Sequence, residues 1–199
     1  MVAENETTPP RQEPPKALVM AVQIIDNVVG RGSGLLFAGL VLPMVGGLCY
    51  EVFARYLFNA PTIWAYDVTY MLYGSHFMLG AAYTLYKGSH IRTDMLYENF
   101  TLRWKGRVDA SMYLVFFFPG MLFFMFAGWD EAMHAWGIGE RSDASPWRPI
   151  IYPFKTVVPV AAGLLIIQGL SEFLKSGYAA LTGEPLIEVE PPALRGDIL

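Results

Sequence analysis

Long apolar blocks alternate with short polar segments along this chain. Three blocks carry no Asp, Glu, Lys or Arg, and they cover 32–50, 68–86 and 110–129. A fourth, 150–171, is interrupted only by Lys155 near its start. A helix needs roughly 20 apolar residues to cross a bilayer core of about 30 Å, whereas a membrane β-strand alternates polar and apolar residues, which these blocks do not. The pattern therefore predicts an all-α integral membrane protein with four transmembrane helices, at about 33–56, 64–86, 108–130 and 150–175.

The segment before the first span, ALVMAVQIIDNVVGRGSG, is amphipathic. Its polar residues recur at three- and four-residue spacing, and apolar residues hold the opposite face, which is typical of a helix. The polar set is Gln23, Asp26, Asn27 and Arg31. We expect an N-terminal amphipathic helix that lies in the membrane interface. The alternative is that these residues form the first turns of a long first helix.

The stretch GSHIRTDMLYENFTLRWKGRVD, residues 88–109, separates the second and third blocks. His90 and Asp94 would share a helix face, but two ligands are too few for a tetrahedral metal site and neither Cys nor another His is near. Apolar residues between the charges, and Lys105 and Arg107 facing lipid phosphates, instead favour a short surface helix. No metal is expected here.

Turn signals divide the chain further. Pro43 and the Gly46–Gly47 pair are predicted kink points of the first span, and the Asn59-Ala60-Pro61 run predicts the turn into the second. The Pro- and Glu-rich ends, 1–16 and 183–199, are predicted to be disordered tails around a membrane domain at 17–182. The N-terminal tail lacks the basic start and apolar stretch of a signal peptide.

Composition supports the membrane assignment. Hydrophobic residues make up 54% of the 199 residues and charged residues 16%, against roughly a quarter charged in soluble domains. The net charge of −4 gives no reason to expect a nucleic-acid partner, and the single cysteine, Cys49, cannot form an intramolecular disulfide.

The distribution of basic residues predicts the orientation, because cytoplasmic loops are rich in Lys and Arg. Of the 14 Lys and Arg residues, four fall in the two loops that follow the first and third spans, namely Arg55, Arg141, Arg148 and Lys155. The others fall in the two tails and the middle loop. We therefore expect both termini and the 88–109 loop to be cytoplasmic.

Three charged residues gather near the turn after the first span. Glu51 and Arg55 are four residues apart at its outer end, and Asp67 begins the second span, where a carboxylate favours a helix N-terminus. They form either a docking or gating point or an ion pair that closes the helical hairpin. If Arg55 pairs with Asp67, exchanging their charges should partly restore what Arg55→Glu removes.

No set of residues in the sequence suggests catalysis or a cofactor. Two histidines at matching depth could ligate a haem, but His76 is near the middle of its span while His90 and His134 lie at opposite ends. We expect His76 to form an interhelical hydrogen bond. Since the predicted spans carry no Asp, Glu, Lys or Arg at their centres, the chain is poorly equipped to carry a charged solute alone. It is expected to pack against another membrane protein.

Two motifs resemble a known family. RYLFNAPTIWAYD, residues 55–67, is similar to the first-loop pattern of the small permease subunit (DctQ type) of tripartite ATP-independent periplasmic (TRAP) transporters, although the family usually has Glu where this chain has Asp67. LGAAYTLYKGSHIRTD, residues 79–94, resembles its second signature, a Leu-Gly-Ala run followed by Gly-x-His-Ile-Arg-x-Asp. ERSDASPWRPIIYPFKTVVPVAAGLLIIQGL resembles the entry to its fourth span, particularly in the branch linked to organic acid uptake.

The resemblance implies a four-span subunit of the bacterial inner membrane, with both termini cytoplasmic and no chemistry of its own. Such a subunit braces a large permease that carries the solute and sodium sites, while a periplasmic binding protein delivers the solute. The motif positions Arg55, Trp64, Asp67, His90, Arg92 and Asp94 would then be structural or subunit-contacting. Two other functions remain open from the residues: a haem- or quinone-associated anchor of a respiratory enzyme, and a small transporter or channel that works alone.

Overall fold

The computed structural model describes residues 14–88 and 100–187. Within them the chain forms helices, turns and one isolated antiparallel bridge, between Arg141 and Ile150. The elements are α1 (Lys16–Ile25), the π-helical turn η1 (Asp26–Gly32), α2 (Ser33–Ala38), α3 (Val41–Phe58), α4 (Ala65–Tyr86), α6 (Leu102–Met112), the π-helical turn η2 (Tyr113–Phe117), α7 (Phe118–Ile138) and α8 (Tyr152–Thr182).

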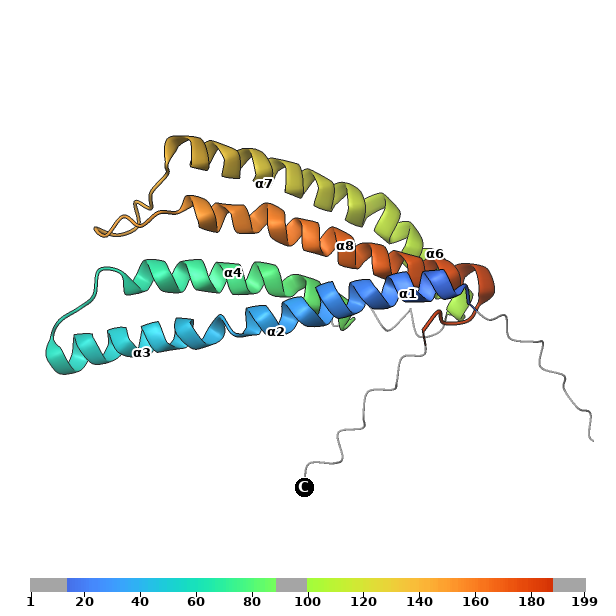
Figure 1. Ribbon diagram of the computed structural model, residues 1–199, viewed down its shortest axis with the longest axis horizontal. Coiled ribbons are helices and arrows are strands. Elements are labelled where there is room, and N and C mark those ends of the chain that lie inside the picture. The colour runs from blue at the N-terminus through green and yellow to red at the C-terminus, as the bar shows by residue number, and fades with distance from the viewer. Residues whose placement is uncertain (1–13, 89–99, 188–199) are drawn as a thin grey trace, which may run out of the picture.

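The first four elements form one helical run with a single interruption, at Gly39 and Leu40 (Figure 1). Pro43 explains the position of this break, because a proline lacks an N–H and its ring clashes with the carbonyl of the residue four positions earlier, here Gly39. The predicted kink at Pro43 is therefore displaced to the preceding turn. Gly46 and Gly47, the other predicted kink points, lie inside uninterrupted α3.

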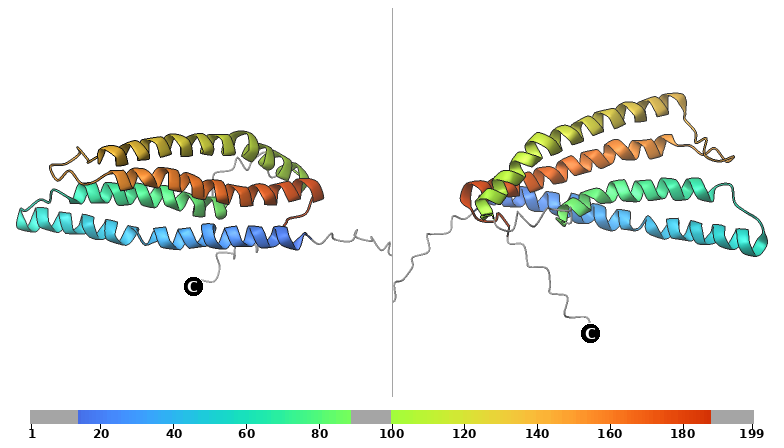
Figure 2. Two further views of the ribbon diagram at one scale, coloured as in Figure 1. Left: turned by 45° about the horizontal axis from the view of Figure 1, so that its top comes forward. Right: turned by 180° about the vertical axis from the view of Figure 1, so that it is seen from behind.

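The long helices lie side by side in the order α7, α8, α4, α3 (Figures 1 and 2). Close packing joins α7 to α8, α8 to α4, and α4 to α2 and α3. The turn after α3 and the loop after α7 lie at one end, which we call the hairpin end. The start of α1, the end of α8 and α6 lie at the opposite end, which we call the terminal end.

Helix α8 is the central element at the terminal end, where α1, η1 and α6 all pack against it. The closest approach is at Gly106 of α6, where an added Cβ would lie 2.5 Å from the Ala180 backbone nitrogen and 2.6 Å from the Ser176 carbonyl oxygen. Only glycine permits two helix backbones to come so near each other.

The residues buried between helices are mostly small. Alanines predominate among the buried apolar residues, whereas most large apolar side chains are exposed on the outside of the helices. Small residues at helix contacts and large apolar residues facing outward are the pattern of helices that pack within lipid. The buried alanines are Ala54, Ala65, Ala82, Ala132, Ala135, Ala161, Ala162 and Ala179.

Among residues 14–88 and 100–187, three helical runs are long and apolar enough to cross a membrane: Lys16–Phe58, Leu102–Ile138 and Tyr152–Thr182. They correspond to the first, third and fourth predicted spans. The second predicted span corresponds to α4, which is helical over 22 residues but is not one of these three. Polar residues such as Asp67, Thr69 and His76 lower its hydropathy. The protein is thus mostly helical with three candidate spans, and the fourth remains a prediction.

Neither predicted surface helix is confirmed. α1 and η1 continue without interruption into α2, which agrees with the alternative of a long first helix. In the middle loop, residues 89–99 lie outside the described residues. Leu102 to Met112 form α6, which continues through η2 into α7. Pro119 accounts for η2, since it lacks the N–H that a regular α-helix would use at that point.

Left-handed residues end three of the helices. Asn59 has φ 49° after α3, Gly139 has φ 61° after α7, and Gly183 has φ 79° after α8. Glycine and asparagine are the residues that adopt this conformation most readily. The predicted turn at Asn59-Ala60-Pro61 is confirmed.

Candidate functional site

Asp26 forms the centre of a buried polar cluster at the terminal end. Asp26 as a whole residue is 8% exposed, and it lies at the start of η1, facing α8. The partners come from one stripe of α8, at spacings of three and four residues that place them on one face of the helix. We call this set the Asp26 cluster: Asp26, Gln168, Ser171, Glu172 and Lys175.

Both carboxylate oxygens of Asp26 are engaged. Oδ1 accepts hydrogen bonds from Gln168 Nε2 at 2.9 Å and from Ser171 Oγ at 2.7 Å. Oδ2 forms an ion pair with Lys175 Nζ at 2.7 Å, and the same ammonium pairs with Glu172 Oε1 at 2.7 Å. A buried charge is tolerated when it is paired and hydrogen-bonded in this way. The cluster therefore joins the N-terminal helical run to α8.

Glu51 closes the hairpin between α3 and α4. Its carboxylate pairs with Arg55 one helical turn later, where Arg55 Nε donates to Oε1 at 2.8 Å. Its other oxygen accepts the backbone N–H of Thr62 at 2.9 Å and the Thr62 hydroxyl. The ion pair is thus within α3, and the contact that spans the turn is the one between Glu51 and Thr62.

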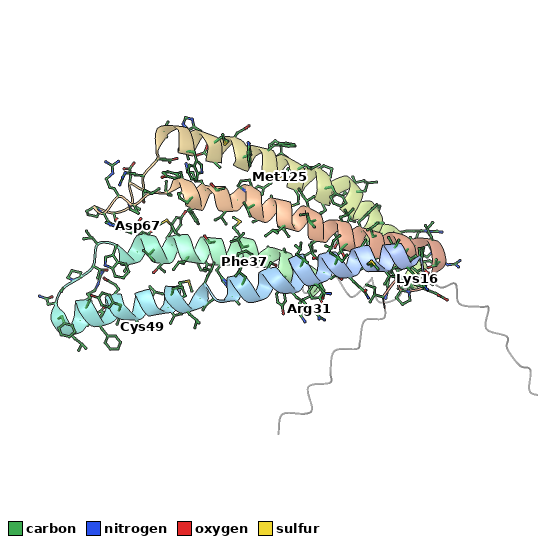
Figure 3. The ribbon with its side chains drawn as sticks, viewed as in Figure 1. Lys16, Arg31, Phe37, Cys49, Asp67 and Met125 are labelled. Atoms are coloured by element: carbon green, nitrogen blue, oxygen red, sulfur yellow. The ribbon has the colours of Figure 1, made fainter. Side chains whose placement is uncertain are left out.

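Asp67 makes different contacts from those expected. It is 2% exposed and accepts hydrogen bonds from Ser142 Oγ at 2.9 Å and from the Ser145 hydroxyl. Both serines belong to the loop between α7 and α8. The condition of the charge-exchange prediction, that Arg55 pairs with Asp67, is therefore not met: the Asp67 carboxylate points to this loop (Figure 3), and Arg55 pairs with Glu51.

Several further contacts join α7 and the loop after it to α8. Lys155 Nζ pairs with Glu131 and with Glu140, each at 2.6 Å. The indole of Trp136 donates to Thr156 Oγ1 at 2.9 Å and packs on Tyr152 with ring centres 4.3 Å apart. Together with Asp67 these contacts fix the loop to α4, α7 and α8 at the hairpin end.

Two other predicted residues lie in the described part. Trp64 precedes the first residue of α4, and its ring stacks on Tyr50 of α3 with centroids 5.7 Å apart. His76 Nδ1 lies 2.9 Å from the Phe37 carbonyl oxygen, at the break after α2. An imidazole that donates to a carbonyl carries its proton on Nδ1. The predicted interhelical hydrogen bond of His76 is confirmed. His90, Arg92 and Asp94 lie outside the described residues.

The sequence interpretation placed Asp26 on the water-facing side of an interfacial helix and so missed its role. A signal was present, since Gln168, Ser171, Glu172 and Lys175 follow a helical stripe at the end of an otherwise apolar block. A polar stripe there requires a polar partner on a neighbouring helix. The residues alone do not indicate which helix supplies that partner.

The chemistry of these groups is that of structural contacts. In each cluster the carboxylate oxygens are taken up by hydroxyl, amide, guanidinium or ammonium groups of the same chain. Among residues 14–88 and 100–187, no three His, Cys, Asp or Glu side chains are grouped so that they could hold a metal ion.

Comparison with known proteins identifies the family. No curated protein matches the chain. The family model described as "Tripartite ATP-independent periplasmic transporters, DctQ component" matches residues 44–176, which is more than half of the chain. This region contains α4, α6, α7, most of α3 and α8, and the Glu51 and Asp67 contacts. The chain therefore belongs to the DctQ family, the small membrane components of TRAP transporters.

Proposed function

We propose that this chain braces the large permease subunit of a TRAP transporter during sodium-driven uptake of an organic acid that a periplasmic binding protein delivers. The family match carries this proposal, since DctQ components work together with a large permease and a periplasmic binding protein. Members of the DctQ family are transporter components, and the family is not an enzyme family. Solute and sodium sites are then assigned to the large subunit.

The arrangement of the helices supports a bracing role. A row in which α7, α8, α4 and α3 lie side by side leaves broad surfaces of these helices uncovered. Large apolar side chains cover them, including Leu42, Phe53, Phe77, Phe123 and Phe126, each more than half exposed. Surfaces this apolar are stable only against lipid or another membrane protein. A wide row also offers a large subunit more contact area than a compact bundle would.

We further propose that α4 is the fourth span and that both termini face the cytoplasm. At 1.5 Å per residue, a helix of 22 residues is about 33 Å long, which matches the bilayer core. Its neighbours α3 and α8 flank it, so several of its polar groups point to protein instead of lipid. The excess of basic residues in the tails and middle loop favours the cytoplasmic side for the terminal end.

A stripe of tyrosines on α4 is our proposed contact surface for the large subunit. Tyr66, Tyr70, Tyr73 and Phe77 follow helical spacing, and each is more than half exposed. Tyr73 lies about 12 Å along the helix from Ala65, where a hydrocarbon environment offers no hydrogen-bond acceptor for its hydroxyl. A partner helix with polar side chains would satisfy these hydroxyls, whereas lipid chains could not.

The residues of the two motifs would then have a structural role. Glu51, Arg55, Trp64 and Asp67 fix the hairpin end, so that the outer loop has a defined shape where a delivered solute arrives. His90, Arg92 and Asp94 keep their proposed role as structural or subunit-contacting positions.

Co-purification tests the proposal. The affinity-tagged large permease is expressed with this chain, and the bound small subunit is quantified after solubilisation. We expect a stoichiometric complex, and uptake by proteoliposomes only when both subunits and the binding protein are present. Tyr73→Arg should abolish co-purification, while Phe123→Arg, the same change on α7, serves as the matched control. A chain that never binds the permease, that transports solute alone, or that shows a haem Soret band would contradict the proposal.

A further inference from the structure

Two tyrosines at the end of α4 rest on two glycines of the first helical run. An added Cβ at Gly30 would lie 2.7 Å from Cγ of Tyr86, and one at Gly34 would lie 2.3 Å from Cδ2 of Tyr83. The two rings are 6.3 Å apart and tilted by 42°. Since the rings fill the space that side chains at 30 and 34 would occupy, they form a fixed aromatic platform between α4 and the η1–α2 segment.

Two cations converge on this platform. Arg31 Nε donates to the Tyr86 hydroxyl at 3.0 Å, and Lys87 Nζ lies 5.8 Å from the Tyr83 ring centre and 5.9 Å from that of Tyr86. Both are exposed residues. The hydrogen bond through Nε leaves the two terminal nitrogens of the guanidinium available to a further acceptor, the arrangement that suits a phosphate group.

The local charge is not balanced. A third cation, Lys175, lies 5.9 Å from the Tyr86 ring centre, but Asp26 and Glu172 both pair with it. The ion pairs formed within the described residues include neither Arg31 nor Lys87. The two carboxylates that pair with Lys175 are thus engaged, and within residues 14–88 and 100–187 the charges of Arg31 and Lys87 are not balanced by an ion pair.

We propose that Arg31 and Lys87, held by Tyr83 and Tyr86, bind the phosphate of an anionic phospholipid headgroup. The position of the two cations at the end of α4 favours a lipid headgroup as the ligand. Lys87 directly follows the last residue of the membrane-length helix α4, and Arg31 lies on the helical run that passes this end (Figure 3). Tyrosines beside basic residues at a helix end are typical of the headgroup level of a bilayer.

Native mass spectrometry of the full-length chain tests the site. The protein is purified in detergent and titrated with phosphatidylglycerol or with phosphatidylcholine of the same acyl chains. We expect one phosphatidylglycerol to be retained at activation energies that strip phosphatidylcholine. The double variant Arg31→Gln/Lys87→Gln should bind phosphatidylglycerol at least about tenfold more weakly. Tyr86→Phe keeps both charges but removes the hydroxyl that orients Arg31, so a smaller loss is expected.

The matched control removes two exposed basic residues at the same end of the molecule that lie away from the platform, Lys16→Gln/Arg103→Gln, and should retain the lipid. Circular dichroism of each variant checks that the helices are intact. Equal loss in both double variants would mean diffuse charge attraction and would overturn the proposal. So would equal retention of the two lipids, or competition by inorganic phosphate at the concentration of the lipid, which would indicate a site for a free anion. Cross-linking of Lys87 to a carboxylate of the large permease would overturn it in favour of a protein partner.

Discussion

The two ends of this protein hold their helices together by different means. At the terminal end, the Asp26 cluster and the close approach at Gly106 join α1, η1 and α6 directly to α8. At the hairpin end, the polar contacts of Glu51 and Asp67 instead attach loop residues to helices. The difference lies in the buried carboxylates: Asp26 joins one helix to another, whereas Glu51 and Asp67 join a helix to a loop residue, beside the α7–α8 contacts of Lys155 and Trp136.

Charge burial is mixed at the hairpin end. In the Asp26 cluster the side chains of Asp26 and Glu172 are 12% and 15% exposed. At the hairpin end Glu51 is 14% exposed, but Arg55 is 56% exposed, Asp143 82% and Arg148 61%. Buried ion pairs are costly to break and exposed ones contribute little. Asp67 is also buried there, bound by neutral hydroxyls.

Replacement of Asp26 should have the largest effect. Asp26→Leu leaves Gln168 Nε2 and Ser171 Oγ without their acceptor and removes one of the two carboxylates on Lys175. We expect the free energy of unfolding to fall by about 3 kcal/mol, measured by equilibrium unfolding in mixed detergent micelles. Asp26→Asn keeps an acceptor oxygen but loses the charge, so it should lower the free energy of unfolding by a smaller amount than Asp26→Leu. Asn27→Leu, next in sequence and exposed, is the control, and an equal loss there would contradict the importance of the cluster.

Gly106→Ala tests the helix contact at the same end. Its Cβ would meet backbone atoms of α8, which cannot move aside as a side chain can, so α6 and α8 must separate. A loss of about 2 kcal/mol is expected in the same unfolding measurement. Gly120→Ala in α7 is the matched control, because an added Cβ there has no neighbour within 4 Å. It should be neutral or stabilising by up to about 1 kcal/mol.

Asp67→Ala should act mainly on the outer loop. Ser142 and Ser145 lose their acceptor, which costs about 1–2 kcal/mol, and the loop is released from α4. Trypsin cleavage after Arg141 should therefore accelerate in variant protein held in nanodiscs. Asp143→Ala in the same loop removes only an exposed pair with Arg148 and should leave the cleavage rate nearly unchanged. Similar rates for Asp67→Ala and wild type would show that the serine contacts do not hold the loop.

The smallest effect is expected at Arg55. Arg55→Ala removes an exposed i,i+4 pair and should cost less than about 0.5 kcal/mol, whereas Glu51→Ala also frees Thr62 and should cost about 1 kcal/mol. A double-mutant cycle should give a coupling energy near zero between Arg55 and Asp67 and a measurable one between Glu51 and Thr62. Rescue of Arg55→Glu by Asp67→Arg would contradict these contacts.

Much of the fold could be predicted from local patterns. The four long apolar blocks marked α3, α4, α7 and α8, because the apolar side chains that a helix needs in lipid can be recognised from composition alone. The helix ends were less well placed: the third block ends at Trp129, but α7 continues to Ile138, since a helix can extend beyond the apolar zone into water. Its end depends on Gly139, whose left-handed conformation stops the helix.

The partners of the polar residues could not be predicted with equal success. The i,i+4 spacing of Glu51 and Arg55 brings the two together, because helix geometry fixes the neighbour. A pair between Asp67 and Arg55 was considered because they flank one turn, yet the partners of Asp67, Ser142 and Ser145, come from a loop far along the chain. Asp26 was placed on the polar face of an amphipathic helix, while its partners lie on α8.

The long helices, the membrane class and the family can be predicted from the sequence, because each depends on residues that are close together in the chain. Three features become visible only in the packed fold: α8 is the central helix at the terminal end, the long helices lie in a row, and Asp26 and Asp67 are buried. The reason is physical: the partner of a buried carboxylate is set by which helices pack together. The packing depends on small residues such as Gly106 and Ala179, which bring together helices that are far apart in the sequence.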